Sequence, residues 1–134
     1  DTRTRMSILR AMAHNRELVM HNDAMALEAY RNILDSKTNT GSAEYFTGLQ
    51  GVARLLSRRG DHEGALDVFK LVDINKLAGT WRASMRISYG QVLEAAGRKS
   101  DASQSYREVL TDEKAAASHR RRAKEAIAGL HAGD

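Results

Sequence analysis

Apolar residues recur every three or four positions along most of this chain of 134 residues, which is the spacing of one helix face. Met6, Leu9 and Met12 open the first such stretch, and six more stretches follow it. The pattern predicts seven helices, at about 4–20, 24–34, 43–58, 62–72, 81–96, 100–110 and 112–130. No stretch alternates apolar and polar residues convincingly, so we expect an all-α fold without strands.

Short polar side chains and acids mark the expected starts of these helices. Four residues precede a predicted helix and can cap its first turn with a side-chain oxygen: Ser42, Asp61, Thr80 and Thr111. Asp112 and Glu113 would then lie in the first turn of the last helix, where negative charge suits the helix dipole. The polar stretches at 21–23 and 35–41 are expected turns.

One spacing recurs along the chain and indicates an internal repeat. Gly60 and Gly97 are each followed five residues later by alanine and nine residues later by an aromatic residue. The same spacing, without the glycine, starts at His21, which lies 39 residues before Gly60, and Gly97 follows Gly60 by 37 residues. The other members of the repeat are Ala26, Ala65 and Ala102, with Tyr30, Phe69 and Tyr106.

Each member of the repeat has a physical reason to be there. Glycine permits the positive φ of a tight turn between two helices. Alanine lets two helices cross closely, and the aromatic ring fills the space between one hairpin and the next. Since a single hairpin cannot bury its apolar face, we expect hairpins at about 4–34, 43–72 and 80–110 to stack into a solenoid.

This pattern resembles the tetratricopeptide repeat (TPR) family, in which a small residue of each first helix packs on the second helix. Ala53 and Gly90 match that position in the second and third hairpins, and the resemblance covers about 43–110. It is weaker in the first hairpin, where His14 stands at the small-residue position. The resemblance implies one domain, a TPR-like α-solenoid of about three antiparallel helical hairpins plus a C-terminal capping helix at about 112–130.

The resemblance also implies where a partner binds, since TPR proteins hold peptides in a concave groove lined by the first helix of each hairpin. The positions that correspond to this groove are Thr47, Gln50, Gly51, Arg54, Arg58, Ser84, Ile87, Ser88 and Gln91. The lysine and asparagine of the carboxylate-clamp subclass do not stand there, so recognition of an acidic C-terminal tail in that manner is not expected. Arg54 and Arg58, one turn apart, could still meet a carboxylate of a partner.

A narrower resemblance is to bacterial cell-envelope proteins of this fold, in which a tryptophan opens the first helix of the last hairpin, as Trp81 does here. This resemblance favours the periplasm over the cytoplasm. The chain begins at Asp1 rather than methionine, so we expect it to be a processed or excised piece. No apolar run in it approaches the roughly 18 residues that a membrane span needs.

Charge and composition narrow the chemistry. Lysine and arginine number 21 against 17 aspartate and glutamate, so the net charge of +4 leaves most charges offset. A basic cluster near the end comprises Arg120, Arg121, Arg122 and Lys124 and could contact phosphates. Because no aromatic residues interleave this cluster for base stacking, the sequence favours a solvated capping face over a nucleic-acid site.

Catalysis and metal binding find little support in the sequence. The absence of cysteine excludes disulfides, thiol catalysis and cysteine-bound zinc. His14 and His21 lie roughly on one helix face without a third ligand at metal spacing, and no Ser, His and acid grouping stands out. We expect a non-catalytic protein–protein interaction module with no metal, cofactor or small-molecule substrate. The alternatives are a structural or oligomerisation scaffold, and contact of the basic last helix with an anionic surface or nucleic acid.

Overall fold

The structure is a computed structural model that describes residues 2–18, 23–35 and 42–132, so the expected turns at 21–23 and 35–41 fall largely outside the described residues. The described part forms seven α-helices, two short 3₁₀ turns and no strand, which confirms the predicted all-α fold. The helices are α1 (Thr2–Leu18), α2 (Asp23–Leu34), α3 (Ala43–Arg58), α4 (His62–Val68), α5 (Gly79–Ala95), α6 (Lys99–Leu110) and α7 (Ala117–His131), and the 3₁₀ turns are η1 (Phe69–Leu71) and η2 (Ile74–Lys76).

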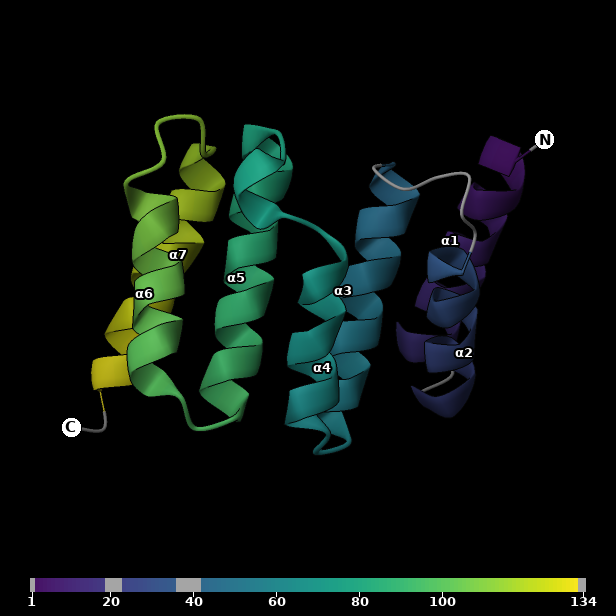
Figure 1. The fold of residues 1–134 in the computed structure, drawn as a ribbon, viewed down its shortest axis with the longest axis horizontal. Coiled ribbons are helices and arrows are strands. Elements are labelled where there is room, and N and C mark those ends of the chain that lie inside the picture. Colours follow the sequence, from purple (N-terminus) through teal and green to yellow (C-terminus); the bar gives the residue numbers. More distant parts are fainter. Residues whose placement is uncertain (1, 19–22, 36–41, 133–134) are drawn as a thin grey trace.

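The helices follow one another in chain order along the long axis of the molecule, from α1 at one end to α6 and α7 at the other (Figure 1). Each α-helix contacts the next one in the chain. The odd-numbered helices also contact one another in order, α1 with α3, α3 with α5 and α5 with α7. Neighbouring helices therefore pack sequentially, and α3 and α5 lie at the middle of the row.

Two of the four expected N-caps are confirmed. The Ser42 hydroxyl accepts the backbone N–H of Tyr45 at 3.1 Å, and the Asp61 carboxylate accepts that of Gly64 at 3.0 Å. Thr80 is not a cap, because α5 begins one residue before it.

The fourth helix is shorter than expected. It ends at Val68, and the chain continues through η1 and η2 instead of reaching residue 72 as one helix. Val72 has an extended backbone, with φ −130° and ψ 152°, which suits a β-branched residue. The Asp73 carboxylate then accepts the N–H of Asn75 at 3.2 Å and closes a separate turn. This local turn replaces the last turn of the predicted helix.

The expected start of the last helix is wrong. Thr111 is the C-cap residue of α6, and α7 begins only at Ala117, so residues 112–116 connect the two helices. The carboxylate of Asp112 accepts the backbone N–H of Lys114 at 3.0 Å and binds arginine side chains of α5. These contacts hold the connection in a non-helical conformation that the local sequence did not indicate.

The repeat glycines close α3 and α5 with the same turn, as predicted. Gly60 and Gly97 have φ of 87° and 80°. In both turns the glycine N–H bonds the carbonyl three residues back, and the following N–H bonds the carbonyl five residues back, with distances of 2.8–3.0 Å. This pair of hydrogen bonds is the Schellman motif, which requires a left-handed residue at the glycine position.

Replacing Gly97 with alanine is expected to destabilise the protein by about 1–2 kcal/mol, because a Cβ disfavours the left-handed conformation. Crowding is not the cause, since nothing lies within 4 Å of the position that the Cβ would take. Asparagine tolerates this conformation better and should cost less than alanine. Urea unfolding of the three proteins tests the assignment, and an alanine variant as stable as the wild type would contradict it.

The alanines and aromatic residues of the repeat are buried, as expected of core positions. The buried members are Ala26, Ala65, Ala102, Tyr30, Phe69 and Tyr106. Tyr30 of α2 packs on Gly51 of the following helix pair. Tyr106 differs from the expectation, because it packs on Gly90 within its own pair of α5 and α6.

Two aromatic pairs join α5 to the preceding helices. Phe69 meets Tyr89 with ring centroids 5.2 Å apart, and Phe46 meets Trp81 with centroids 5.1 Å apart. Trp81 is half-buried against the core and packs between the helix pairs. These contacts fix the separation of α3 and α5, between which the candidate site lies.

Candidate functional site

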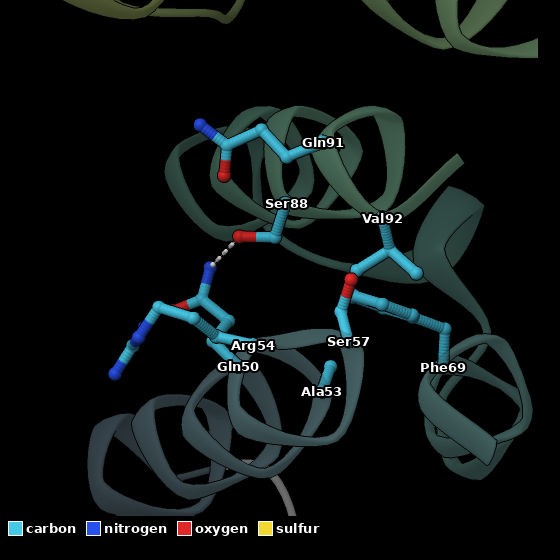
Figure 2. Close-up of a pocket in the computed structure, with 8 residues that line it drawn as sticks. All are labelled: Gln50, Ala53, Arg54, Ser57, Phe69, Ser88, Gln91 and Val92. Carbon is cyan, nitrogen blue, oxygen red and sulfur yellow. Dashed lines mark hydrogen bonds between the residues drawn. The ribbon is translucent and has the colours of Figure 1, made fainter. Parts of the chain in front are cut away.

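A small cavity opens between α3 and α5 (Figure 2). Its volume is about 100 Å³, and its lining residues are Gln50, Ala53, Arg54, Ser57, Phe69, Ser88, Gln91 and Val92. Ala53, Phe69 and Val92 are buried and supply the apolar part. The remaining five side chains are polar, and Arg54 is the only charged one among them. The cavity therefore combines an apolar floor with hydrogen-bonding walls and one cation at its edge.

Four of the predicted groove residues line this cavity, namely Gln50, Arg54, Ser88 and Gln91. The Gln50 amide nitrogen donates to the Ser84 and Ser88 hydroxyls, at 2.8 and 3.0 Å. Since Ser84 and Ser88 lie one turn apart on α5, this amide bridges the two helices and holds the cavity wall in place (Figure 2). Gln91 is exposed and makes no such bridge, so its amide remains available to a bound molecule.

The two predicted groove arginines both interact with α2. The Arg54 guanidinium lies 5.9 Å from the centre of the Tyr30 ring, and its Nη2 is 3.5 Å from the Tyr30 hydroxyl. Arg58 forms an ion pair with Asp23 at 3.0 Å. Figure 2 shows the Arg54 side chain extending away from the cavity. The arginines thus brace α3 against α2, and Arg54 alone also borders the cavity.

Three further groove predictions receive a different place. Gly51 and Ile87 are buried and are not part of a binding surface. A Cβ on Gly51 would lie 2.7 Å from the ring atoms of Tyr30, so the close approach that this glycine permits is to the chain's own tyrosine. The Thr47 hydroxyl donates to the Ala43 carbonyl of its own helix at 2.9 Å.

Ser57 was not predicted and joins the cavity through a hydrogen bond at the turn between α3 and α4. Its hydroxyl lies 3.3 Å from Nδ1 of His62, which pairs the end of one helix with the start of the next. Among the described residues no carboxylate is hydrogen-bonded to this imidazole, so the pair lacks the third member of a hydrolytic triad. The contact has a structural role that closes one end of the cavity.

The basic cluster of the last helix is divided between two roles. Arg120 is half-buried, and its Nη2 donates to the Asp112 carbonyl at 2.6 Å. Arg121, Arg122 and Lys124 are exposed on α7. Three of the four predicted cations therefore face solvent, while the first anchors the connection that precedes the helix.

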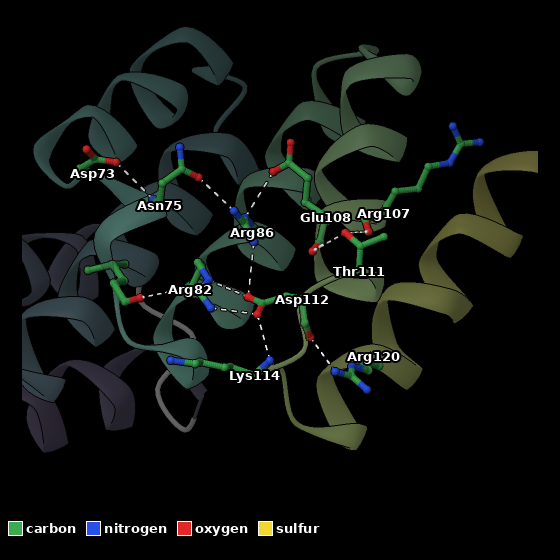
Figure 3. Close-up of polar contacts among 11 residues, drawn as sticks. Asp73, Asn75, Arg82, Arg86, Arg107, Glu108, Thr111, Asp112, Lys114 and Arg120 are labelled. Atoms are coloured by element: carbon green, nitrogen blue, oxygen red, sulfur yellow. Dashed lines mark hydrogen bonds and ion pairs between the residues drawn. The ribbon is translucent and has the colours of Figure 1, made fainter.

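Asp112 is the centre of a charged network that the sequence did not reveal (Figure 3). Arg82 binds both of its carboxylate oxygens, at 2.6 and 2.8 Å, and Arg86 approaches one of them at 3.5 Å. The Asp112 side chain is 8% exposed. Hydrogen bonding from Arg82, together with the Lys114 N–H and Arg86, lowers the pKa of the Asp112 carboxyl to about 2, although burial opposes the shift.

The same network reaches three other parts of the chain. Arg86 donates to the Asn75 side chain at 2.9 Å and pairs with Glu108 at 3.2 Å (Figure 3). The arginines at 82 and 86 share one face of α5, which their spacing predicts. Their acidic partner lies 30 residues away from Arg82, and no local pattern indicates it. The network ties η2, α5, α6 and the connection to α7 into one unit.

Metal and membrane features were also searched among the described residues. They contain no group of three or more His, Cys, Asp or Glu side chains placed to hold a metal ion. His14 is exposed on α1, its neighbour Ala13 is the buried small residue there, and His21 lies outside the described part. None of the described helices combines the length and apolar character needed to cross a membrane.

Comparison with known proteins yields no relative, since no protein family, curated protein sequence or solved structure matches this chain. The fold by itself defines the class of the protein, which is an all-α protein whose seven described helices pack in sequence.

Proposed function

We propose that this chain is a TPR-like protein-interaction module that holds a peptide segment of a partner over the cavity between α3 and α5. The observation that carries the proposal is the position of the cavity. It lies between the first helices of two successive helix pairs, and the TPR family, which the sequence resembles, binds peptides at this place. The ordered contacts of α1 with α3, α3 with α5 and α5 with α7 support a solenoid in which these helices line one face.

The size and chemistry of the cavity favour a peptide side chain over a small-molecule substrate. Ligand pockets usually enclose about 300–1,000 Å³, whereas this cavity encloses about 100 Å³. Its floor of Ala53, Phe69 and Val92 suits a small aliphatic side chain. Gln91 at the rim can bond the peptide backbone, and Arg54 favours a neighbouring carboxylate. The proposed function is therefore binding without catalysis.

Filling the cavity should abolish this binding. Peptides selected by display on the wild-type protein are expected to bind Gln91→Trp at least about tenfold more weakly, because the indole occupies the rim that the peptide needs. Gln104 is the matched control, since it is also an exposed glutamine of the same helix pair but lies outside this cavity. Gln104→Trp should bind within about twofold of wild type. Fluorescence anisotropy with one labelled peptide measures all three proteins.

Equal affinity of the wild type and Gln91→Trp would show that the peptides bind elsewhere and would refute the proposed site. Equal loss in both tryptophan variants would point to a general effect on folding, which circular dichroism of each variant reveals.

A scaffold that self-associates is the alternative favoured by a separate observation. Ile8 and Met12 lie one turn apart on α1 and are 55% and 41% exposed. Exposed apolar residues at the end of a helix row suit contact with another chain, because terminal helices of such rows usually carry a polar outer face. Sedimentation of the purified protein at rising concentration distinguishes a lone module from a self-associating one. Contact of α7 with nucleic acid or an anionic surface has only the exposed Arg121, Arg122 and Lys124 in its favour.

A further inference from the structure

A second cavity lies at the other end of the molecule, between the start of α6 and the end of α7. Its volume is about 270 Å³, several times the roughly 30 Å³ that a water molecule occupies in the liquid. Its lining residues are Lys99, Ser100, Ser103, Arg107, Leu130 and His131. None of these residues is acidic, and two carry a permanent positive charge.

Three of these side chains form one stripe along α6. Lys99, Ser103 and Arg107 are spaced four residues apart, so they share a face of the helix over about 12 Å. Arg107 takes no part in the Asp112 network and extends away from it (Figure 3). Two cations therefore flank a central serine, an arrangement that repels itself unless an anion lies between them.

Ser103 is the observation that points to a ligand. It is 7% exposed, and its hydroxyl has no hydrogen-bond partner among the described residues. A buried hydroxyl without a partner costs stability, so such groups are normally satisfied. Ser105, two residues later and equally buried, illustrates the rule because its hydroxyl donates to the Arg86 carbonyl at 2.7 Å.

The first turn of α6 adds further donors. No side chain caps it, so its backbone N–H groups and the positive end of the helix dipole are directed at the end of the cavity that holds Lys99 and Ser100. The acid of that turn, Asp101, lines a different cavity. Donors thus converge from a lysine, an arginine, two hydroxyls and a helix terminus, which suits a tetrahedral oxyanion better than a planar carboxylate.

We infer that this cavity is a phosphate-binding site in which Lys99, Ser103 and Arg107 hold the phosphate oxygens. The phosphate is either a free phosphate ion or the headgroup of a lipid such as phosphatidic acid. The site is separate from the cavity between α3 and α5, and the inference does not depend on the proposed peptide binding.

Ser103→Ala separates a ligand contact from a structural one. Without phosphate, the variant should melt at the same temperature as wild type or higher, because it removes a buried hydroxyl that has no partner. With inorganic phosphate, wild type should gain stability through binding, and Ser103→Ala should lose most of that gain. Ser105→Ala is the matched control, which should be less stable than wild type yet keep the full response to phosphate.

Arg107→Gln tests the same site through an exposed side chain that folding does not require. Titration with inorganic phosphate, followed by amide chemical shifts of α6, should give a dissociation constant about tenfold weaker than wild type, or about 1.4 kcal/mol. General stabilisation by phosphate as a salt would appear equally in every variant. An equal response in wild type, Ser103→Ala and Arg107→Gln would therefore overturn the site.

Vesicles distinguish the two sources of phosphate. Phosphatidylcholine vesicles with and without phosphatidic acid are sedimented with wild type and with Arg107→Gln. Recruitment that needs both phosphatidic acid and Arg107 identifies a lipid headgroup. Saturable binding of inorganic phosphate without such recruitment identifies a free phosphate. Failure of both would refute the inference.

Discussion

Replacing Gly90 with alanine is expected to destabilise the protein by about 1–3 kcal/mol, the usual cost of overpacking a core. A Cβ at this position would lie 2.5 Å from Cε1 of Tyr106 and 2.8 Å from its Cζ. The ring cannot easily move away, because it is 1% exposed and its hydroxyl donates to Glu94 at 3.1 Å. The substitution therefore forces α5 and α6 apart where they cross.

Gly129 provides a control with the opposite expected sign. It also lies inside a helix, α7, but nothing is within 4 Å of the position that its Cβ would take. Gly129→Ala should stabilise the protein by about 0.5–1 kcal/mol, since alanine is the better helix former. Urea unfolding of both variants measures the two free energies. A Gly90→Ala variant that gains stability as Gly129→Ala does would mean that Tyr106 does not constrain the crossing.

Replacing Asp112 with alanine is expected to cost about 3 kcal/mol at neutral pH, as the loss of one partner of a buried ion pair does. The Arg82 and Arg86 side chains are only 19% and 14% exposed and would lose the carboxylate that compensates their charge. The connection to α7 would also lose its bond to the Lys114 N–H. Asp67→Ala is the control, because the Asp67–Lys70 pair is exposed and should contribute less than about 1 kcal/mol.

The pH dependence of stability follows from the same carboxylate. Its pKa falls from the ordinary 3.8 to about 2 on folding, so folded Asp112 stays ionised where the unfolded chain is already protonated. Its contribution is fully present above about pH 4 and is lost as the pH falls from about 4 to about 2. The difference in unfolding free energy between wild type and Asp112→Ala should therefore shrink across this window. A constant difference down to pH 2 would show that the Asp112 charge is not what stabilises the connection.

Part of the candidate site could be predicted from the sequence. Gln50, Arg54, Ser88 and Gln91 follow from the repeat spacing, because residues at fixed positions of a helix share a face. Gly51 was misplaced because small residues serve both at an open surface and beneath a ring, and only the position of Tyr30 distinguishes the two. The apolar floor was missed, since Phe69 comes from a neighbouring helix whose contact with the cavity is a tertiary property.

Local interactions explain what the sequence determined by itself. The helices, the caps at Ser42 and Asp61 and the turns at Gly60 and Gly97 depend on residues within about five positions of one another, so their signals lie in the chain itself. Tertiary structure alone decided the rest. Thr111 and Asp112 read locally as the start of a helix, yet Arg82, 30 residues away, draws the carboxylate into an ion pair that keeps the connection open. The hydroxyl of Ser103 likewise has significance only because packing buries it without a partner.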